Sequence, residues 1–172
     1  EGDAIQRAAD TWTNTGGADF NFSYLGAHSA AVSSFNGKNE ILWAPLGPTS
    51  AIALTTTWYS GNTILETDIR FNSDYGWGIG AGNFYDVETI ALHELGHWLN
   101  LSDVYGSIDA ENDAAKVMYG FGYQNNTKRD LRPADQAGIF YIYGAETLFD
   151  DNWATEELSG IHAQLKAASG VV

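Results

Sequence analysis

The chain has 172 residues, 44% of them hydrophobic and 17% charged, which fits one domain with a sizeable core. Its 22 Asp and Glu against 8 Lys and Arg give a net charge of −14, which disfavours nucleic acids and anionic membranes as partners. No apolar run approaches the roughly 20 residues that insert across a membrane. The absence of cysteine excludes thiol catalysis, zinc–thiolate sites and disulfides, so any metal site must use His, Asp and Glu. A start at Glu1 rather than Met predicts a processed or trimmed chain.

The first half of the chain predicts one helix followed by strands. Residues 3–13 carry apolar side chains at helical spacing, from Ile5 to Trp12. Alternation, β-branched residues or a short apolar run predict four strands, at 20–24, 41–44, 50–59 and 63–71. Ser60-Gly61-Asn62 supplies a turn between the last two, and the Gly-rich segment 72–86 is expected to be loop.

The second half predicts helices separated by irregular chain. Asp86 and Glu88 open a helix over 87–99, and Pro133 can take the first position of a helix that runs to Tyr143. Apolar spacing in the tail, 147–172, indicates one more helix. Because strands come first and helices later, the sequence predicts an α+β domain over 1–146, followed by the tail.

The strongest chemical signal is the pair His93 and His97 with Glu94 between them. On a helix, residues i and i+4 lie on one face with Cβ atoms about 5–6 Å apart, so two imidazoles can bind one metal ion. Glu94 lies about 100° round the helix, which is too offset for a third ligand in line. It is well placed beside the ion to accept a proton from water.

A third protein ligand is predicted at Asp103, six residues after His97. Zinc sites of catalytic type use three protein ligands and one open position. For Asp103 to reach the ion, the helix must end and turn sharply near Asn100. Asn is the usual second choice after Gly for the left-handed conformation that such a turn requires.

These segments resemble the metzincin metallopeptidases, and the matrixins most of all. The resemblance rests on HELGHWLNLSD at 93–103, VMYG at 117–120 and LRPADQAGIFYIYG at 131–144, which stand in the family's order and spacing. It implies a zincin fold: a twisted mixed sheet, an active-site helix, a turn containing Met118 beneath the metal, and a C-terminal helix. It also implies His93 and His97 as zinc ligands and Glu94 as the general base. Asp103 stands where matrixins have a third His, as in snapalysin-type enzymes.

By the same resemblance, the chain is a secreted zinc endopeptidase that binds one zinc ion and protein or peptide substrates. An extended substrate would pair with the strand 50–59, and Tyr123 is the candidate for the wall of the primed-side pocket. Asn72 and Ser73 replace family residues that bind calcium, so a calcium ion has no support there. The acidic residues Asp109, Glu111, Asp113, Asp150 and Asp151 are expected in solvated turns, with calcium binding as an alternative.

Matrixins also begin with a strand that lies inside the sheet, whereas this chain starts at the helix. An upstream segment, the tail or a neighbouring subunit is expected to supply that strand, because an empty position in a sheet exposes unpaired backbone groups.

Two alternatives to a matrixin-like peptidase remain open. One is a non-catalytic zincin-fold protein that serves in structure, binding or assembly and holds a structural or vestigial zinc. Glu94 argues against it, because a purely structural site needs no general base. The other is a gluzincin-like peptidase that takes Glu111 as its third ligand.

Overall fold

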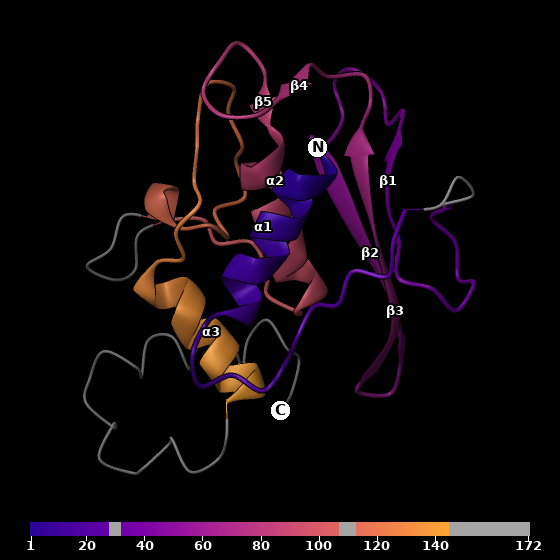
Figure 1. Cartoon of the computed structure of the whole chain (residues 1–172), viewed down its shortest axis with the longest axis vertical. Helices are drawn as coiled ribbons and strands as arrows, with labels where there is room; N and C mark the ends of the chain where they lie inside the picture. Colours follow the sequence, from indigo (N-terminus) through magenta and orange to yellow (C-terminus); the bar gives the residue numbers. More distant parts are fainter. Residues whose placement is uncertain (28–31, 107–112, 145–172) are drawn as a thin grey trace.

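A computed structural model describes residues 1–27, 32–106 and 113–144 of the chain (Figure 1). The described elements are, in chain order, α1 (Gly2–Thr13), β1 (Ile41–Ala44), β2 (Ala53–Ser60), β3 (Thr63–Asn72), β4 (Trp77–Gly78), β5 (Tyr85–Asp86), α2 (Val87–Trp98), the 3₁₀ turn η1 (Asp113–Ala115) and α3 (Pro133–Tyr143). Helices and a mixed sheet in this order confirm the predicted α+β class.

The main sheet has the strand order β1-β3-β2. β3 is the central strand: it runs parallel to β1, with Ile69 opposite Ile41, and antiparallel to β2, with Ile69 opposite Thr55. The turn at Gly61 and Asn62 joins β2 to β3 as a hairpin, as the sequence predicts.

Helix α2 contacts α1 as well as the strands β2 and β3 of the sheet. Trp12 of α1 is fully buried, and its indole nitrogen donates a hydrogen bond to the carbonyl oxygen of Leu92 at 2.8 Å. Ile69 and Phe71 of β3 belong to the same core cluster as Leu92. This shared core fixes α2 against α1 and the sheet, since buried apolar contacts supply most of a domain's cohesion.

The polar face of β3 is buried as well. Glu66 accepts hydrogen bonds from the backbone amides of Asn36 and Gly37, and Asp68 accepts one from the amide of Glu40. The loop before β1 therefore covers the face that the alternation of β3 marks as polar, and carboxylates rather than apolar side chains hold it there.

The prediction of a strand at 20–24 is wrong. Phe20 and Phe22 do pack against the core, with ring contacts to Tyr143 and Trp98, so the period-two burial is real. However, no ladder forms there, because within the described ranges no strand lies beside this segment; the nearest pairing is an isolated bridge between Ala18 and Gly144. The outer edge of β1 likewise has no strand partner in the described part of the chain. The source of an additional strand remains a prediction.

Two smaller expectations also need correction. The segment 72–86 is not all loop, because β4, within it, pairs in parallel with β5, at its end. Asp113 is not solvated: it is buried and forms an ion pair with Lys116. A buried carboxylate of this kind requires a cationic partner, which the local sequence pattern does not reveal.

Some predictions fall on residues outside the described ranges: the tail helix over 147–172 and the acidic residues Asp109, Glu111, Asp150 and Asp151. Among the helices that the structure does describe, none combines the length and the hydropathy needed to span a membrane.

Candidate metal centre

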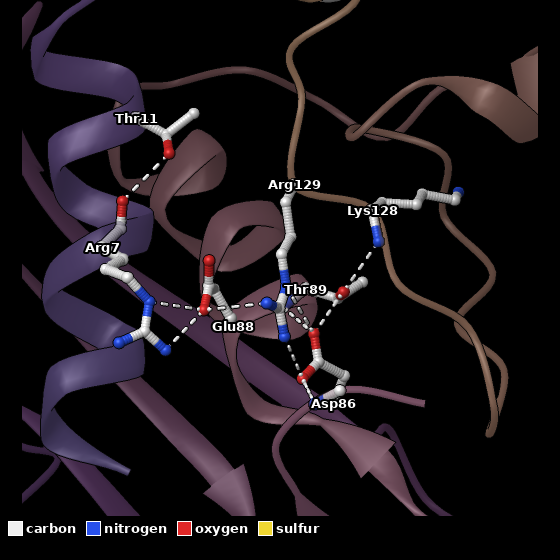
Figure 2. Close-up of polar contacts among 8 residues, drawn as sticks. Arg7, Thr11, Asp86, Glu88, Thr89, Lys128 and Arg129 are labelled. Carbon is white, nitrogen blue, oxygen red and sulfur yellow. Dashed lines mark hydrogen bonds and ion pairs between the residues drawn. The ribbon is translucent and has the colours of Figure 1, made fainter. Parts of the chain in front are cut away.

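Helix α2 begins where the sequence predicts, and its first turn is held by charged contacts. Asp86 is the N-cap: its carboxylate accepts hydrogen bonds from the amide and the hydroxyl of Thr89. Figure 2 shows Glu88 between two guanidinium groups, that of Arg7 at 2.7 Å and that of Arg129 at 3.5 Å. Arg129 also pairs with Asp86 at 2.9 Å. These contacts join the start of α2 to α1 and to the segment that precedes α3.

The electrostatics of the cap follow from these contacts. Burial alone would raise the pKa of Asp86, but the hydrogen bonds from Gly80, Thr89 and Arg129 outweigh it and lower that pKa below its usual value. The ionised form of Asp86 therefore stabilises the folded state.

Farther along α2, His93 and His97 bring their Nε2 atoms within 3.1 Å of each other. Asp103 adds its Oδ1 atom at 3.2 Å from Nε2 of His93 and 3.4 Å from Nε2 of His97. Among the residues that the structure describes, these three form the group that could hold a metal ion.

This triangle has the dimensions of a zinc site. Zinc bonds of about 2.0–2.1 Å in tetrahedral geometry separate the ligand atoms by about 3.3–3.4 Å. The Nδ1 atoms lie 2.9 Å from the carbonyl oxygen of Val117, for His93, and 2.8 Å from that of Leu101, for His97. Since a carbonyl only accepts, each Nδ1 carries a proton, so the neutral form of each ring has its Nε2 lone pair toward the centre and can bind a cation there. Three acceptor atoms at this spacing fit a cation.

The sharp turn after α2 places Asp103. Asn100 has φ 68°, the left-handed conformation expected of it, and the amide of Leu101 donates to the carbonyl of Gly96 at 3.0 Å. The chain thus folds back along the helix, and the carboxylate returns to the two imidazoles.

Charge at the centre favours a cation. Burial would lower the pKa of His97, but the hydrogen bond to Asp103 and the negative charge of Glu94 outweigh it and raise that pKa. Burial would raise the pKa of Asp103, but the hydrogen bonds from His93 and His97 keep it far below its usual value. The carboxylate is therefore ionised and available as a ligand at neutral pH.

Glu94 is buried beside the ligands and is held from the sheet. The hydroxyl of Thr55, in β2, donates to its Oε2 atom at 2.5 Å, although Thr55 and Glu94 are 39 positions apart. The sequence did not reveal this contact, because nothing near the His-Glu-His pattern indicates which strand residue will face the carboxylate.

Met118 lies buried beneath α2. A Cβ atom on Gly96 would come within 2.2 Å of its sulfur, so a larger residue at position 96 would force the Met118 side chain to move. The buried carboxylate of Asp135, in α3, accepts the amides of Val117 and Met118 at 3.0 and 3.1 Å. This turn also supplies the carbonyl that orients His93.

A cavity of about 920 Å³ surrounds the three candidate ligands and Glu94. The lining includes residues of β2, from Ala53 to Tyr59, and residues of the segment from Tyr119 to Lys128, Tyr123 among them. Tyr105, which the sequence gave no reason to select, also lines the cavity, and its hydroxyl donates to Oδ2 of Asp103 at 3.0 Å. That hydrogen bond raises the pKa of Tyr105 above its usual value, because it favours the protonated hydroxyl.

The Asn72 side chain, at a position that binds calcium in the family, is used for hydrogen bonds within the protein. It is fully buried and bonded to backbone: Oδ1 accepts from Leu46 and Asp74, and Nδ2 donates to Gly47 and Ala51. The amide joins the ends of the loop that enters β2.

Comparison with known proteins adds an independent observation. A family model described as Matrixin matches residues 2–144. Stromelysin-3 of Mus musculus is 33% identical over 79 residues, which are 46% of this chain and 14% of that protein, and the Homo sapiens protein is 32% identical over the same length. Matrilysin of Felis catus is 26% identical over 141 residues, which are 81% of this chain and 50% of that protein. The chain therefore spans half or less of the curated relatives it matches.

Proposed function

The chain belongs to the matrixin family of metallopeptidases, and on that premise we propose that it is a zinc-dependent endopeptidase that cleaves extended protein substrates. The observation that carries the proposal is the zinc-sized triangle of His93, His97 and Asp103, with the carboxylate of Glu94 buried beside it in the same cavity.

Three residues would bind the metal, and one would transfer protons. His93, His97 and Asp103 would hold the zinc ion. A zinc ion bound there would supply Lewis-acid chemistry, polarising the scissile carbonyl and making water more acidic. Glu94 would accept a proton from the attacking water and later donate it to the leaving amine.

The fold supports a peptide substrate in particular. β2 pairs with β3 along one edge, and residues of β2 line the cavity on the side of α2. A substrate in extended conformation could add to β2 as a further strand, so that backbone hydrogen bonds position the scissile bond near Glu94. Tyr123, which also lines the cavity, would contact the substrate on the primed side.

Met118 would be the Met-turn residue of the family, since it lies buried under the helix that carries both histidines. Secretion is proposed from family membership.

The first test is hydrolysis of an unstructured protein by the zinc-loaded chain, with the Glu94→Ala variant as the control. Removing a general base should reduce kcat by at least roughly 10²-fold. Zinc content should not change, because Glu94 is outside the ligand group. Asp103→Ala is the complementary variant and should lose zinc and activity together.

The competing function is a non-catalytic zincin-fold protein whose metal is structural. No hydrolysis by the wild-type chain while it holds one zinc ion would support that alternative. Equal hydrolysis by wild type and Glu94→Ala would contradict the role given to Glu94.

A further inference from the structure

The two oxygens of Asp103 have different partners. Oδ1 faces the Nε2 atoms of His93 and His97, while Oδ2 accepts the hydroxyl of Tyr105 at 3.0 Å. The carboxylate therefore presents a single oxygen to the centre. Asp103 is partly exposed and lies on a turn rather than on a helix, so its own backbone does little to fix that orientation.

Tyr105 itself is held by the segment that follows Met118. Its ring packs edge-on against Phe121, with the centroids 5.4 Å apart. It also lies so close to Gly120 that a Cβ there would come within 2.3 Å of the hydroxyl oxygen. Tyr105 is nonetheless a surface side chain with 58% of its area exposed, so the hydroxyl's contact with Asp103 is not a consequence of burial.

The backbone reinforces this arrangement. The amide of Val104 donates to the carbonyl of Met118 at 2.8 Å, and Val104 forms a parallel bridge with Tyr119. The residues on either side of Val104 are Asp103 and Tyr105, so the bridge sets both side chains relative to the turn beneath α2. The position of the Tyr105 hydroxyl is thus determined independently of the two histidines.

A carboxylate ligand without such a partner can rotate or bind through both oxygens, which would occupy more of the coordination sphere. A catalytic zinc site needs three protein ligands and an open fourth position, and groups that hydrogen-bond to a ligand are what fix its orientation. We propose that Tyr105 is the positioning residue of the third ligand: its hydroxyl holds Oδ2 of Asp103, so that the ion receives Oδ1 alone. The inference rests on the proposed function only in taking Asp103 as a zinc ligand.

The test is Tyr105→Phe, which removes the hydroxyl and keeps the ring that packs on Phe121. Zinc affinity is measured by competition with a chromophoric chelator. Loss of a hydrogen bond to a ligand should weaken zinc binding by about 10–100-fold. The chain loaded with Co²⁺ gives a second readout, because its visible absorption distinguishes four-coordinate from five-coordinate sites. We expect a change in band position and intensity in the variant.

Tyr119→Phe is the matched control, because Tyr119 lines the same cavity and its ring packs on the same Phe121. Its zinc affinity and Co²⁺ spectrum should equal those of the wild type. In an Asp103→His background the third ligand has no second carboxylate oxygen to anchor. There, Tyr105→Phe should change zinc affinity by less than about twofold, since the two positions would no longer be coupled.

The outcomes separate this inference from the proposed function. Unchanged zinc affinity and Co²⁺ spectrum in Tyr105→Phe would overturn the inference. So would an equal loss of affinity in the wild-type and Asp103→His backgrounds, because Tyr105 would then act on the loop rather than through the carboxylate. A wild-type chain that binds zinc but cleaves nothing would refute the proposed function and leave the role of Tyr105 intact.

Discussion

The carboxylate of Glu94 accepts a hydrogen bond from Thr55 of the sheet, and this contact predicts a role for Thr55. The Thr55 hydroxyl reaches Oε2 of Glu94 at 2.5 Å, and a hydrogen bond to a charged group typically contributes about 1.5–3 kcal/mol. Thr55→Val, which keeps the shape and removes the hydroxyl, should lower kcat by about 10-fold because the carboxylate loses its orientation. Thr55→Ser, which keeps the hydroxyl, should retain most of the wild-type kcat.

The measurement is kcat and KM for both variants on one peptide substrate, with zinc content determined for each. KM should change little, since Thr55→Val leaves the backbone of β2 intact for substrate pairing. Wild-type kcat in Thr55→Val would show that Glu94 needs no anchor in the sheet.

Asp68 predicts a stabilising substitution. It is fully buried near Glu40 and Glu66, and its Oδ2 atom has no hydrogen-bond partner among the described residues. Burial raises the pKa of Asp68, and the negative charges of Glu66 and Glu40 raise it further. The backbone amides of Glu40 and Ser34 oppose this rise only in part. A carboxyl whose folded pKa lies above its unfolded value destabilises the fold once the pH exceeds both. That cost shrinks as the pH falls through the folded pKa and is gone once the pH is below 3.8.

Asp68→Asn should therefore raise the free energy of unfolding at pH 7, on the order of 1 kcal/mol, which is about 2–4 °C in Tm for a domain of this size. The gain should shrink toward pH 4, where the wild-type carboxyl is also neutral. Asp68→Ala is the control: it removes the acceptor for the amide of Glu40 and should destabilise. A lower Tm for Asp68→Asn at pH 7 would contradict the argument.

At the residue scale, the sequence predicts what a local motif contains and misses what distant segments bring. His93, Glu94 and His97 follow from one helical turn, and Asp103 from the turn that Asn100 permits. Thr55 comes from another element and could not be found by spacing. Tyr105 is two positions from Asp103, yet its role depends on Gly120 and Phe121, which only the fold places beside it.

At the scale of elements, the start of α2 depends on Asp86. Its carboxylate caps the helix and pairs with Arg129, and both contacts use the ionised form (Figure 2). Asp86→Ala removes both the capping oxygen and the charge and should lower the free energy of unfolding by about 2 kcal/mol. Asp86→Asn keeps a capping oxygen and should lower it by about half as much. Thermal or urea unfolding at pH 7 gives both values.

Comparison of the wild type with Asp86→Asn also tests how the stability contributed by Asp86 depends on pH. Because the folded pKa of Asp86 lies below its unfolded value, its contribution is complete above pH 3.8 and is lost as the pH falls through the folded pKa. The stability difference between wild type and Asp86→Asn should accordingly narrow as the pH falls below about 4. A difference that stays constant from pH 7 to pH 3 would show that the charge of Asp86 contributes nothing.

Among the described residues, the predicted helices are confirmed and one predicted strand is wrong, for a physical reason. Asp86 marks the start of α2, and Pro133 and Gly144 mark the start and the end of α3. Each of these signals acts within a few residues of the helix end. The segment 20–24 has the alternation of a strand, but a strand also requires a neighbour for its backbone groups, and alternation does not say whether one is present.

At the scale of the whole molecule, the candidate ligands and the groups that orient them come from three parts of the chain. His93 and His97 belong to α2, Asp103 to the turn behind it, and the carbonyl that orients His93 to the turn of Met118. That turn is in turn held by Asp135 of α3. A metal ion at the centre would bind the folded arrangement and not the dispersed ligands of the unfolded chain.

Metal removal should therefore lower stability as well as activity. Zinc at about 100 times its Kd stabilises the folded state by about 2.7 kcal/mol, so chelation should lower Tm by roughly 5–10 °C. Asp103→Ala should show little of this zinc-dependent shift, because it removes a ligand. Glu94→Ala should show all of it, since Glu94 is outside the ligand group. Thermal unfolding of the three proteins with zinc and with chelator measures both effects. A full zinc-dependent shift in Asp103→Ala would mean that the ion binds elsewhere, and the triangle of His93, His97 and Asp103 could not then be the centre that ties α2 to the two turns.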